Sequence, residues 1–429
     1  MSMLYSWQEP SAQRLVEILS KGNIALDASE TGTGKSYIAC EALKRLNRRA
    51  VVIAPKSAIS MWHRVAEEMG AQLLDVINIE ALRSGKGRWY GNKMWHLAPP
   101  NNMLIWDECH KGASGPKTIT TEMLAFTKAY KVPVLALSAT IASNPLKLRA
   151  LGFLLGLHNY NPSSFYNWCR ANGCHNSPFH SGLEFTKRTD VARQCMDRIH
   201  NAIQDRMVRI RIEDVPEFPE CDTQCNLYDL DAGNTEEINR IYAEMDQKLK
   251  EPHNNVLVEL GRARQKVELL KVPLLMDLVE DHLEEGKSVV VFCNYTETLK
   301  ILEAECHYRH LKPSVIHGQQ LTTAERDMEI REFQENRTPV CIAMGQAGGV
   351  SISLHDIHHQ RPRVALITPS YNETEFKQVL GRIHRAGGTK SLQVIVLAAG
   401  TIEEKVYSAI QRKLSNLDAL TDGDLRGDL

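Results

Sequence analysis

The sequence contains no apolar run that approaches the roughly 20 residues needed to cross a bilayer as a helix. Its first residues, Met1 to Pro10, also lack a basic stretch followed by an apolar one, so they do not resemble a secretory signal. The ten cysteines show no regular spacing, which argues against a disulfide framework and indicates a reducing compartment. We therefore expect no membrane partner and an intracellular location, in the cytoplasm or, in a eukaryotic host, the nucleus.

The chain also lacks an excess of charge of either sign. Its 51 basic and 52 acidic side chains give a formal net charge of -1, so the global charge neither favours nor excludes a polyanionic partner. Any surface for nucleic acid must therefore be local. The hydrophobic content of 43% and the charged content of 24% are typical of globular proteins, and 429 residues indicate two or three domains.

A glycine-rich stretch, S-E-T-G-T-G-K-S, occupies residues 29–36. It follows a short apolar run and precedes apolar residues at helical spacing, so we expect a strand, a loop and a helix in that order. Gly32, Thr33 and Gly34 lie where backbone N–H groups can turn inward around phosphate oxygens, next to the positive end of the helix dipole. Lys35 would then reach the outer phosphates of ATP, and Ser36 would bind a magnesium ion.

One residue within this stretch and one upstream of it leave the interpretation open. Ser29 occupies the position at which the full pattern, G-x-x-x-x-G-K-[ST], has its first glycine, so a simple glycine-rich turn is the alternative. Gln8 lies upstream, and its amide could bind an adenine edge through a donor and an acceptor. On its own, Gln8 could equally be an ordinary polar surface residue.

Further apolar runs at 50–54, 103–106 and 134–137 predict buried parallel strands. Ligands bind at the carboxyl ends of such strands, and Asp107 and Glu108 follow the second run. We assign Asp107 to the magnesium ion and Glu108 to the attacking water, with a solvated turn as the alternative. Ser138 and Thr140 follow the third run, where small hydroxyl groups could hydrogen-bond across to the acidic pair.

Residues 156–255 show a looser periodicity, and we expect them to form a helical elaboration between two lobes. Arg206, Arg209 and Arg211 could contact phosphates there, or could lie at a solvated helix end. A zinc site is a further hypothesis, because thiolate and imidazole groups can form a tetrahedral site. Its candidate ligands, whose spacing fits no standard finger, are Cys169, Cys174, His175 and His180. We assign the later pair, Cys221 and Cys225, to ordinary strand positions.

Strand and helix patterns alternate again in the second half of the chain. The apolar runs lie at 289–292, 314–316, 340–343, 364–367 and 393–397. This half contains no phosphate loop, so we expect a partner sheet that closes on nucleotide held by the first half. The expected fold is therefore α/β, with two parallel sheets flanked by helices. Its domains are a first lobe at 1–155, the elaboration at 156–255, and a second lobe at 256–429.

Two loops of the second half carry the remaining candidates. Gly348 and Gly349 lie in the loop G-Q-A-G-G, where a bare backbone can approach a phosphate or a nucleic-acid strand. Arg382 and Arg385 lie in the stretch Q-V-L-G-R-I-H-R, on one face if that stretch is helical. Guanidinium groups can neutralise the charge of a γ-phosphate during its transfer. The alternative is a surface helix with ion pairs.

In their order, these motifs resemble a superfamily-2 helicase core. The segments A-P-K-S-A-I-S-M-W at 54–62 and I-E-A-L-R at 79–83 are similar to the Swi/Snf-related branch of DNA translocases. The resemblance runs from about residue 4 to residue 420 and implies two tandem RecA-like lobes, ATP as substrate and magnesium. The sequence departs from that branch at Cys109, at S-A-T in place of the usual T-G-T, and at Gly345-Gln346.

The resemblance also implies roles for individual residues. Gly349 would contact ATP together with the phosphate loop. Coupling of hydrolysis to movement would involve His110, Ser138, Thr140 and Gln378. Contacts to the nucleic-acid backbone are expected from Lys56, Ser57, Arg83, Asn294, Gly318 and Gly348, and backbone contacts carry little base preference.

The expected function is therefore an ATP-dependent motor that moves along double-stranded DNA, in the 3′ to 5′ direction by resemblance. Two alternatives stay open: a helicase that separates DNA or RNA strands, and a nucleic-acid-binding module with a vestigial ATPase. No stretch reads as a nuclease, chromatin-reader or dimerisation segment, so we expect a compact monomer that other proteins recruit.

Overall fold

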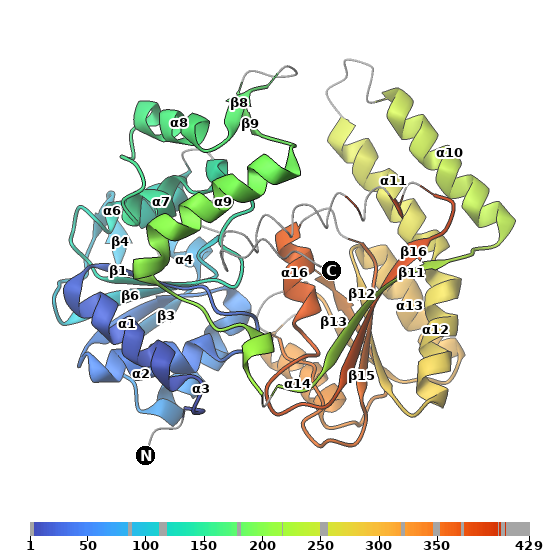
Figure 1. The fold of residues 1–429 in the computed structure, drawn as a ribbon. Helices are drawn as coiled ribbons and strands as arrows, with labels where there is room; N and C mark the ends of the chain where they lie inside the picture. The colour runs from blue at the N-terminus through green and yellow to red at the C-terminus, as the bar shows by residue number, and fades with distance from the viewer. Residues whose placement is uncertain are drawn as a thin grey trace. The chain divides into compact units, whose positions relative to one another are not determined.

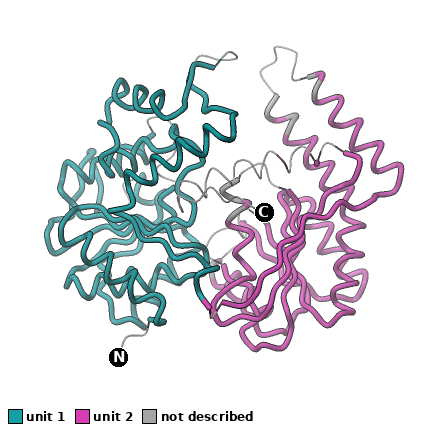
Figure 2. Tube along the Cα trace, in the orientation of Figure 1, with its two compact units in different colours: residues 1–215, 412–428 teal, residues 216–411, 429 magenta. Residues whose placement is uncertain are grey.

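The computed structural model describes residues 4–84, 88–110, 118–177, 182–216, 218–248, 256–318, 322–345, 352–369, 373–401, 403–404 and 408. The chain forms two compact units, and the division falls between Val215 and Pro216 (Figure 2). Each unit has its own six-stranded parallel sheet, so each is described by itself.

Unit 1 contains the amino-terminal half of the chain, whose elements are labelled in Figure 1. Its helices are α1 (Glu9–Lys21), α2 (Lys35–Arg45), α3 (Ile59–Met69), α4 (Ile79–Arg83), α6 (Ile119–Phe126), α7 (Arg149–Leu154), α8 (Pro162–Ala171) and α9 (Thr189–Ile203). Its main strands are β1 (Ile24–Asp27), β2 (Arg49–Ile53), β3 (Leu73–Ile77), β6 (Asn102–Asp107), β7 (Val134–Leu137) and β10 (Met207–Val208). Two small hairpins add β4 (Tyr90–Gly91) with β5 (Met94–Trp95), and β8 (Cys174–Asn176) with β9 (Leu183–Phe185).

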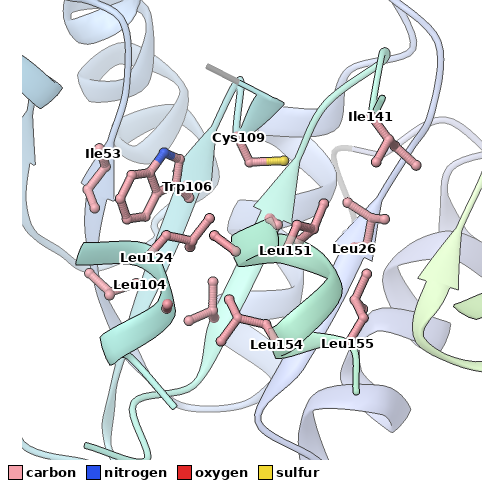
Figure 3. Close-up of a cluster of buried hydrophobic side chains, with 14 of the residues drawn as sticks. Leu26, Ile53, Leu104, Trp106, Cys109, Leu124, Ile141, Leu151, Leu154 and Leu155 are labelled. Atoms are coloured by element: carbon pink, nitrogen blue, oxygen red, sulfur yellow. The ribbon is translucent and has the colours of Figure 1, made fainter. Parts of the chain in front are cut away.

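The sheet of unit 1 has the order β10-β1-β7-β6-β2-β3, and all its pairs are parallel. The central strands are apolar on both faces because helices cover both sides, as buried parallel sheets require. Side chains of α6, α7 and α9 pack on one face, in the cluster of which Figure 3 shows a part. Trp106 and Cys109 belong to this cluster, directly beside the acidic motif.

Unit 2 repeats the alternation of strands and helices (Figure 1). Its strands are β11 (Cys221–Tyr228), β12 (Ser288–Cys293), β13 (Pro313–Ile316), β14 (Val340–Met344), β15 (Arg363–Ile367) and β16 (Ser391–Ala398), in the sheet order β11-β16-β15-β12-β14-β13. Its helices are α10 (Ala232–Lys248), α11 (Val256–Leu270), α12 (Val272–Glu284), α13 (Thr296–Tyr308), α14 (Thr323–Gln334) and α16 (Glu373–Leu380). Helices α12 and α13 pack on one face of this sheet through a core of aliphatic side chains and cysteines.

Local sequence explains several helix boundaries. Helix α6 begins with a capping box in which Thr118 and Thr121 exchange side-chain and backbone hydrogen bonds. Helix α14 has the same arrangement between Thr322 and Glu325. Helix α3 ends at Gly70, whose φ of 64° is the left-handed conformation that glycine adopts most easily at a helix end.

The expected α/β fold with two parallel sheets is confirmed, and every apolar run named above forms a strand at or within one or two residues of its expected bounds. Residues 156–255 do not form one body: β10 belongs to the first sheet, whereas β11 belongs to the second. Cys221 and Cys225 lie in strand β11 as expected. No helix in the described part of the chain is long and apolar enough to span a membrane.

Candidate nucleotide site and nucleic-acid contacts

Three functional loops of unit 1 begin at the same edge of its sheet. Strand β7 lies between β1 and β6, and its last residue, Leu137, pairs with Asp27 on one side and Asp107 on the other. Because parallel strands end at a common edge, the loops after β1, β6 and β7 are neighbours although they are far apart in sequence. The phosphate loop, the acidic motif and S-A-T are these three loops.

The phosphate loop has the backbone that its glycines predict. Gly32 and Gly34 have φ values of 98° and 78°, and α2 begins directly afterwards at Lys35. The ammonium group of Lys35 donates hydrogen bonds to the backbone oxygens of Ser29 at 2.8 Å and Glu30 at 3.0 Å. The lysine is therefore held inside its own loop by two carbonyl groups, which a phosphate could replace.

Gln8 lies against the phosphate loop and is only 3% exposed. Its Nε2 atom donates to the backbone oxygen of Thr33 at 2.9 Å, and its Oε1 atom accepts from the backbone nitrogen of Tyr5 at 3.0 Å. A Cβ atom at Gly34 would crowd this Nε2 atom, so a side chain there would displace the Gln8 amide, and the positive φ favours glycine in any case. The amide that was expected to bind adenine thus binds the loop backbone in this structure.

Asp107 ends strand β6, and its carboxylate is held from two sides. The indole nitrogen of Trp62 donates to Oδ2 at 2.9 Å, and the backbone nitrogen of Glu108 donates to Oδ1 at 3.0 Å. Burial, followed by the nearby charge of Glu108, raises the pKa of Asp107 to about 6, although Trp62 and Lys35 oppose the rise. A cation beside Asp107 would relieve this cost, because it favours the ionised carboxylate.

Glu108 has a left-handed backbone with a φ of 51°, which is unusual for a residue other than glycine. Such conformations are held in place by their surroundings and occur at functional sites. Here the next residue fixes the turn: Cys109 donates its backbone N–H to the oxygen of Leu137 at 3.0 Å and buries its side chain in the core. Core packing therefore accounts for the cysteine that departs from the family pattern (Figure 3).

A chain of polar contacts joins the acidic motif to S-A-T. Nδ1 of His110 lies 3.3 Å from Oε2 of Glu108 and 2.9 Å from Oγ of Ser138. The hydroxyl of Ser138 in turn donates to the backbone oxygen of Thr140 at 2.6 Å. The side chains of His110 and Ser138 that were expected to couple these two loops are therefore in direct contact, whereas Thr140 takes part through its backbone.

The donor atoms present fit a nucleoside triphosphate with magnesium. The carboxylate of Asp107 and the hydroxyl of Ser36, in the first turn of α2, are hard oxygen ligands of the kind magnesium prefers. Magnesium commonly takes only one or two protein ligands and completes its shell with substrate phosphates and water. Asp27 was not among the residues predicted from the sequence. Its Oδ1 accepts from the nitrogen of Ser29 at 2.9 Å, and its Oδ2 is buried without a partner in the described structure.

The nucleic-acid candidates of unit 1 lie in two short segments. Lys56 is exposed and begins a 3-10 turn directly after β2, and half-buried Ser57 follows it. Arg83 is exposed at the last residue of α4. Because β2 is the neighbour of β6, Lys56 follows a strand end at the same edge of the sheet as the acidic motif.

In unit 2, Asn294 uses its amide hydrogens inside the protein. Nδ2 donates to Glu268 at 2.7 Å, to Oγ1 of Thr368 at 3.0 Å and to the oxygen of Pro369 at 3.2 Å. The carboxylate of Glu268 is buried and also accepts from the backbone nitrogens of Asn294 and Tyr295. This arrangement gives Asn294 a structural role and disfavours the phosphate contact expected of it.

The other candidates of this unit lie in three separate segments. Gly318 is exposed after β13. Gly348 and Gly349 lie outside the described residues. Gln378 is buried in α16, with 2% of its surface exposed.

The arginine pair does not lie on a helix. Helix α16 ends at Leu380, and Gly381 follows at the position where glycine commonly terminates helices. The two guanidinium groups nevertheless converge, because Nη1 of Arg382 and Nη2 of Arg385 donate to the backbone oxygen of Ile352 at 3.2 and 3.3 Å. Arg382 is 2% exposed, whereas Arg385 is half-buried, so Arg385 is the more accessible of the two.

The zinc hypothesis gains no support from the described residues. Cys169 and Cys174 lie in a hydrophobic cluster with Phe165, and a hydrogen bond between the two thiols raises the pKa of Cys174 further than burial does. His175 instead lies 3.1 Å from a carboxylate oxygen of Glu184. No group of three metal-binding side chains occurs in the described part of the chain, and His180 lies outside it.

A comparison with known proteins decides the family. Over 460 aligned positions the chain is 31% identical to a protein of Acanthamoeba polyphaga mimivirus whose name describes it as an ATP-dependent RNA helicase, and the match covers 99% of this chain and 84% of that protein. This chain is a superfamily-2 helicase. The conserved C-terminal helicase domain matches residues 270–387, within unit 2.

The helicase is also related to the Swi/Snf branch. It is 32% identical over 139 residues to the human DNA excision repair protein ERCC-6-like, and 29% identical over 147 residues to the DNA repair and recombination protein RAD54 of Saccharomyces cerevisiae. These matches cover 32% of this chain but only 11% and 15% of those proteins. As a member of this family, the helicase is a nucleic-acid-dependent ATPase.

The fold agrees with a solved helicase structure. The structure of S. cerevisiae Dbp5 bound to RNA and ADP BeF3 matches with a TM-score of 0.51 at 13% identity, covering 96% of this chain and 88% of that one. At this identity the likeness establishes the tandem RecA-like fold and nothing finer.

Proposed function

We propose that this helicase is a translocase that uses ATP hydrolysis to move along double-stranded DNA, with little preference for base sequence. The observation that carries the proposal is the common sheet edge from which the loops of Lys35, Asp107 and Glu108 start, because these groups suit a phosphate, a metal ion and a water. The choice of duplex DNA rests on the similarity to the two DNA repair proteins.

Each residue of unit 1 has a defined task in the proposed reaction. Lys35 leaves the carbonyls of Ser29 and Glu30 and binds the outer phosphates of ATP. Asp107 and Ser36 would hold magnesium, which would supply positive charge that offsets the negative charge of the phosphates. Glu108 orients the water that attacks the γ-phosphate. These groups are half-buried, and partial exclusion of water strengthens the electrostatic interactions among them.

The polar chain from Glu108 through His110 to Ser138 connects hydrolysis to the backbone of unit 1. A change at the γ-phosphate alters the position of Glu108, and the contacts at 3.3 and 2.9 Å pass that change to the S-A-T loop. We assign Thr140 to the same path, because its backbone bonds to the Ser138 hydroxyl. Two rigid arrangements of this chain would suffice to link ATP turnover to a conformational step.

Arg385 of unit 2 is proposed to act on the same triphosphate as an arginine finger, with Arg382 holding the loop. The support is their shared acceptor, Ile352 O, and the lower exposure of Arg382. We expect Arg385→Ala to leave ATP binding nearly intact while turnover falls about a thousandfold. Arg337→Ala, at an exposed ion pair of the same unit, is the matched control. Loss of binding without a change in turnover would contradict the finger role.

Movement requires that both units grip the nucleic-acid backbone in alternation. We propose contacts from Lys56, Ser57 and Arg83 in unit 1, and from Gly318 and the 345–349 loop in unit 2. We also propose a reducing compartment, because the ten cysteines show no regular spacing. We further propose that the helicase acts as a monomer.

A nucleic-acid panel tests the proposal. Steady-state ATPase rates are measured with duplex DNA, single-stranded DNA and RNA of matched length, at several salt concentrations because backbone binding depends on salt. Strong stimulation by duplex DNA is expected. Stimulation by RNA alone would instead favour a strand-separating RNA helicase, in line with the name of the mimivirus relative.

The same panel with Glu108→Gln separates a motor from a binding module. The substitution keeps the shape of the side chain but removes its charge, so turnover should collapse while nucleic-acid binding persists. Duplex binding with no turnover in the wild-type protein, and no effect of Glu108→Gln, would show a vestigial ATPase.

A further inference from the structure

A short segment of unit 1 lies beside the phosphate loop immediately before the chain enters unit 2. Strand β10 pairs in parallel with β1, with Leu26 opposite Met207 and Asp27 opposite Val208. Eight residues after Val208 the chain reaches Pro216, where unit 2 begins. The edge strand of the nucleotide-binding sheet is therefore continuous with the connection between the units.

The pairing continues past the end of the strands and into the loop itself. The nitrogen of Ala28 donates to the oxygen of Val208 at 2.9 Å, and the nitrogen of Glu30 donates to the oxygen of Ile210 at 3.0 Å. The nitrogen of Ile210 donates to the hydroxyl of Ser29 at 3.0 Å. Ser29 is the residue that replaces the first glycine of the phosphate-loop pattern, and glycine would offer no side-chain acceptor here.

Side chains add a second set of contacts to the same loop. The carboxylate of Glu30 accepts from the backbone nitrogen of Ile212 at 2.7 Å and lies 3.3 Å from Nη2 of Arg209. Nη1 of Arg209 also donates to the backbone oxygen of Ala28. The side chain of Arg209 is 9% exposed and that of Glu30 27%, so these charge-assisted bonds are partly shielded from water and salt. Neither expectation for this arginine, a phosphate contact or a solvated helix end, describes its position.

The loop residues held in this way are those that hold the catalytic lysine. Lys35 donates to the backbone oxygens of Ser29 and Glu30. The side chains of these two residues bind Ile210, Ile212 and Arg209. A shift of the segment therefore moves the carbonyl groups that compete with phosphate for the lysine. In the other direction, departure of the lysine changes the position of Ser29 and Glu30, and with it their hydrogen bonds to the segment.

We propose that residues 207–212, bonded to Ser29 and Glu30, form a linker clamp that couples the nucleotide state of the loop to the connection between the units. Arg209 and Ser29 are positioning residues in this clamp, since neither would touch the reacting atoms. The inference rests on the proposed function in one respect, that nucleic acid stimulates the ATPase. Because coupling between two sites is reciprocal, nucleotide must alter the segment as much as the segment alters nucleotide binding.

The first arm of the test uses variants. Arg209→Gln removes the charge that faces Glu30, Arg209→Lys retains it, and Ser29→Gly restores the family pattern while removing the acceptor for Ile210. The matched control is Arg211→Gln, because Arg211 pairs instead with Asp214 and Glu213. ATP KM, basal kcat and DNA-stimulated kcat are measured for each variant.

For Arg209→Gln we expect the ratio of stimulated to basal kcat to fall about tenfold, as loss of one charge-assisted bond implies. Basal kcat should change less than twofold. Arg209→Lys should recover part of the ratio, and Arg211→Gln should keep all of it. Equal losses of basal and stimulated rates, or an unchanged ratio in Arg209→Gln and Ser29→Gly, would overturn the clamp.

The second arm needs neither a variant nor catalysis. Hydrogen exchange of peptides covering 207–216 is measured in the wild-type protein with and without a non-hydrolysable ATP analogue, whose binding is confirmed by titration. The clamp predicts a change in exchange at the amides of Ile210 and Ile212, whose acceptors belong to the loop. No change with bound analogue overturns the clamp. If no nucleic acid stimulates the wild-type ATPase, the proposed function fails and this arm alone decides the clamp.

Discussion

Acidification should destabilise unit 2 through one half-buried histidine, His355. Its ring lies beside Gly388, in the region of the arginine pair, and Nδ1 is buried without a hydrogen-bond partner in the described structure. Burial is the main cause that lowers its pKa to about 4, and the cations of Arg385 and Arg363 add to the effect. His359 acts in the same direction, whereas Asp356 opposes it.

The sign and size of the effect follow from linkage. In the unfolded chain the histidine titrates near its ordinary value of 6.5, so at pH 5 the unfolded state is protonated while the folded state is neutral. The folded state therefore loses stability as the pH falls from 6.5 towards about 4. Between pH 7 and pH 5 the expected loss is about 2 kcal/mol, at 1.36 kcal/mol for each tenfold change in proton binding.

The assay is urea unfolding at pH 7 and pH 5 for the wild type and for His355→Gln, which cannot titrate. Other titrating groups contribute equally to both proteins, so the difference in pH dependence isolates His355. The variant should lose about 2 kcal/mol less than the wild type on acidification. His307→Gln, at an exposed position on α13, is the matched control. An identical pH dependence in His355→Gln and the wild type would refute this reasoning.

Two further predictions concern hydrogen bonds to carboxylates, one part-buried and one buried. Trp62→Phe removes the donor to Asp107, and kcat/KM for ATP should fall about tenfold because a bond to a charged group is lost. Trp89→Phe removes a similar bond at 2.7 Å, to a carboxylate elsewhere in unit 1, and should leave ATPase kinetics unchanged; equal effects of both would contradict the assignment. Lys271→Met breaks a buried pair with Glu403 at 2.8 Å and should cost about 3–5 kcal/mol in urea unfolding. Adding Glu403→Leu should recover most of the lost stability, because it removes the buried carboxylate that the first substitution leaves without a cation. A double variant no more stable than Lys271→Met alone would contradict this explanation.

The strands were predictable because a parallel sheet covered on both faces requires continuous apolar runs. The runs at 103–106 and 134–137 correspond to β6 and β7 for this reason. Strand β10 was missed because two residues carry no periodic signal. Strand β3 has a polar residue, Asp75, among its five residues, so its sequence predicts a buried strand less clearly than those of β2 and β6.

The site was predictable where spacing alone determines geometry and unpredictable where the partner is distant in sequence. The positive φ values of Gly32 and Gly34 follow from the motif itself. The contact between Ser29 and Ile210 spans 181 positions, and no local pattern reports such a bond. Gly381 did carry a usable signal, because glycine after an apolar helical stretch predicts the end of α16 before the arginine pair.

The charges at the sheet edge link the binding of ATP to the binding of magnesium. Asp27 and Asp107 flank Leu137 at the ends of neighbouring strands, and burial raises the pKa of both carboxyl groups. Lys35 opposes the rise at both positions, so one ammonium group offsets two buried carboxylates. When Lys35 turns towards a phosphate it gives up part of that role, and a divalent cation beside Asp107 is the group that can replace it. ATP and magnesium should therefore bind cooperatively, because each removes a cost that the other alone would leave in place.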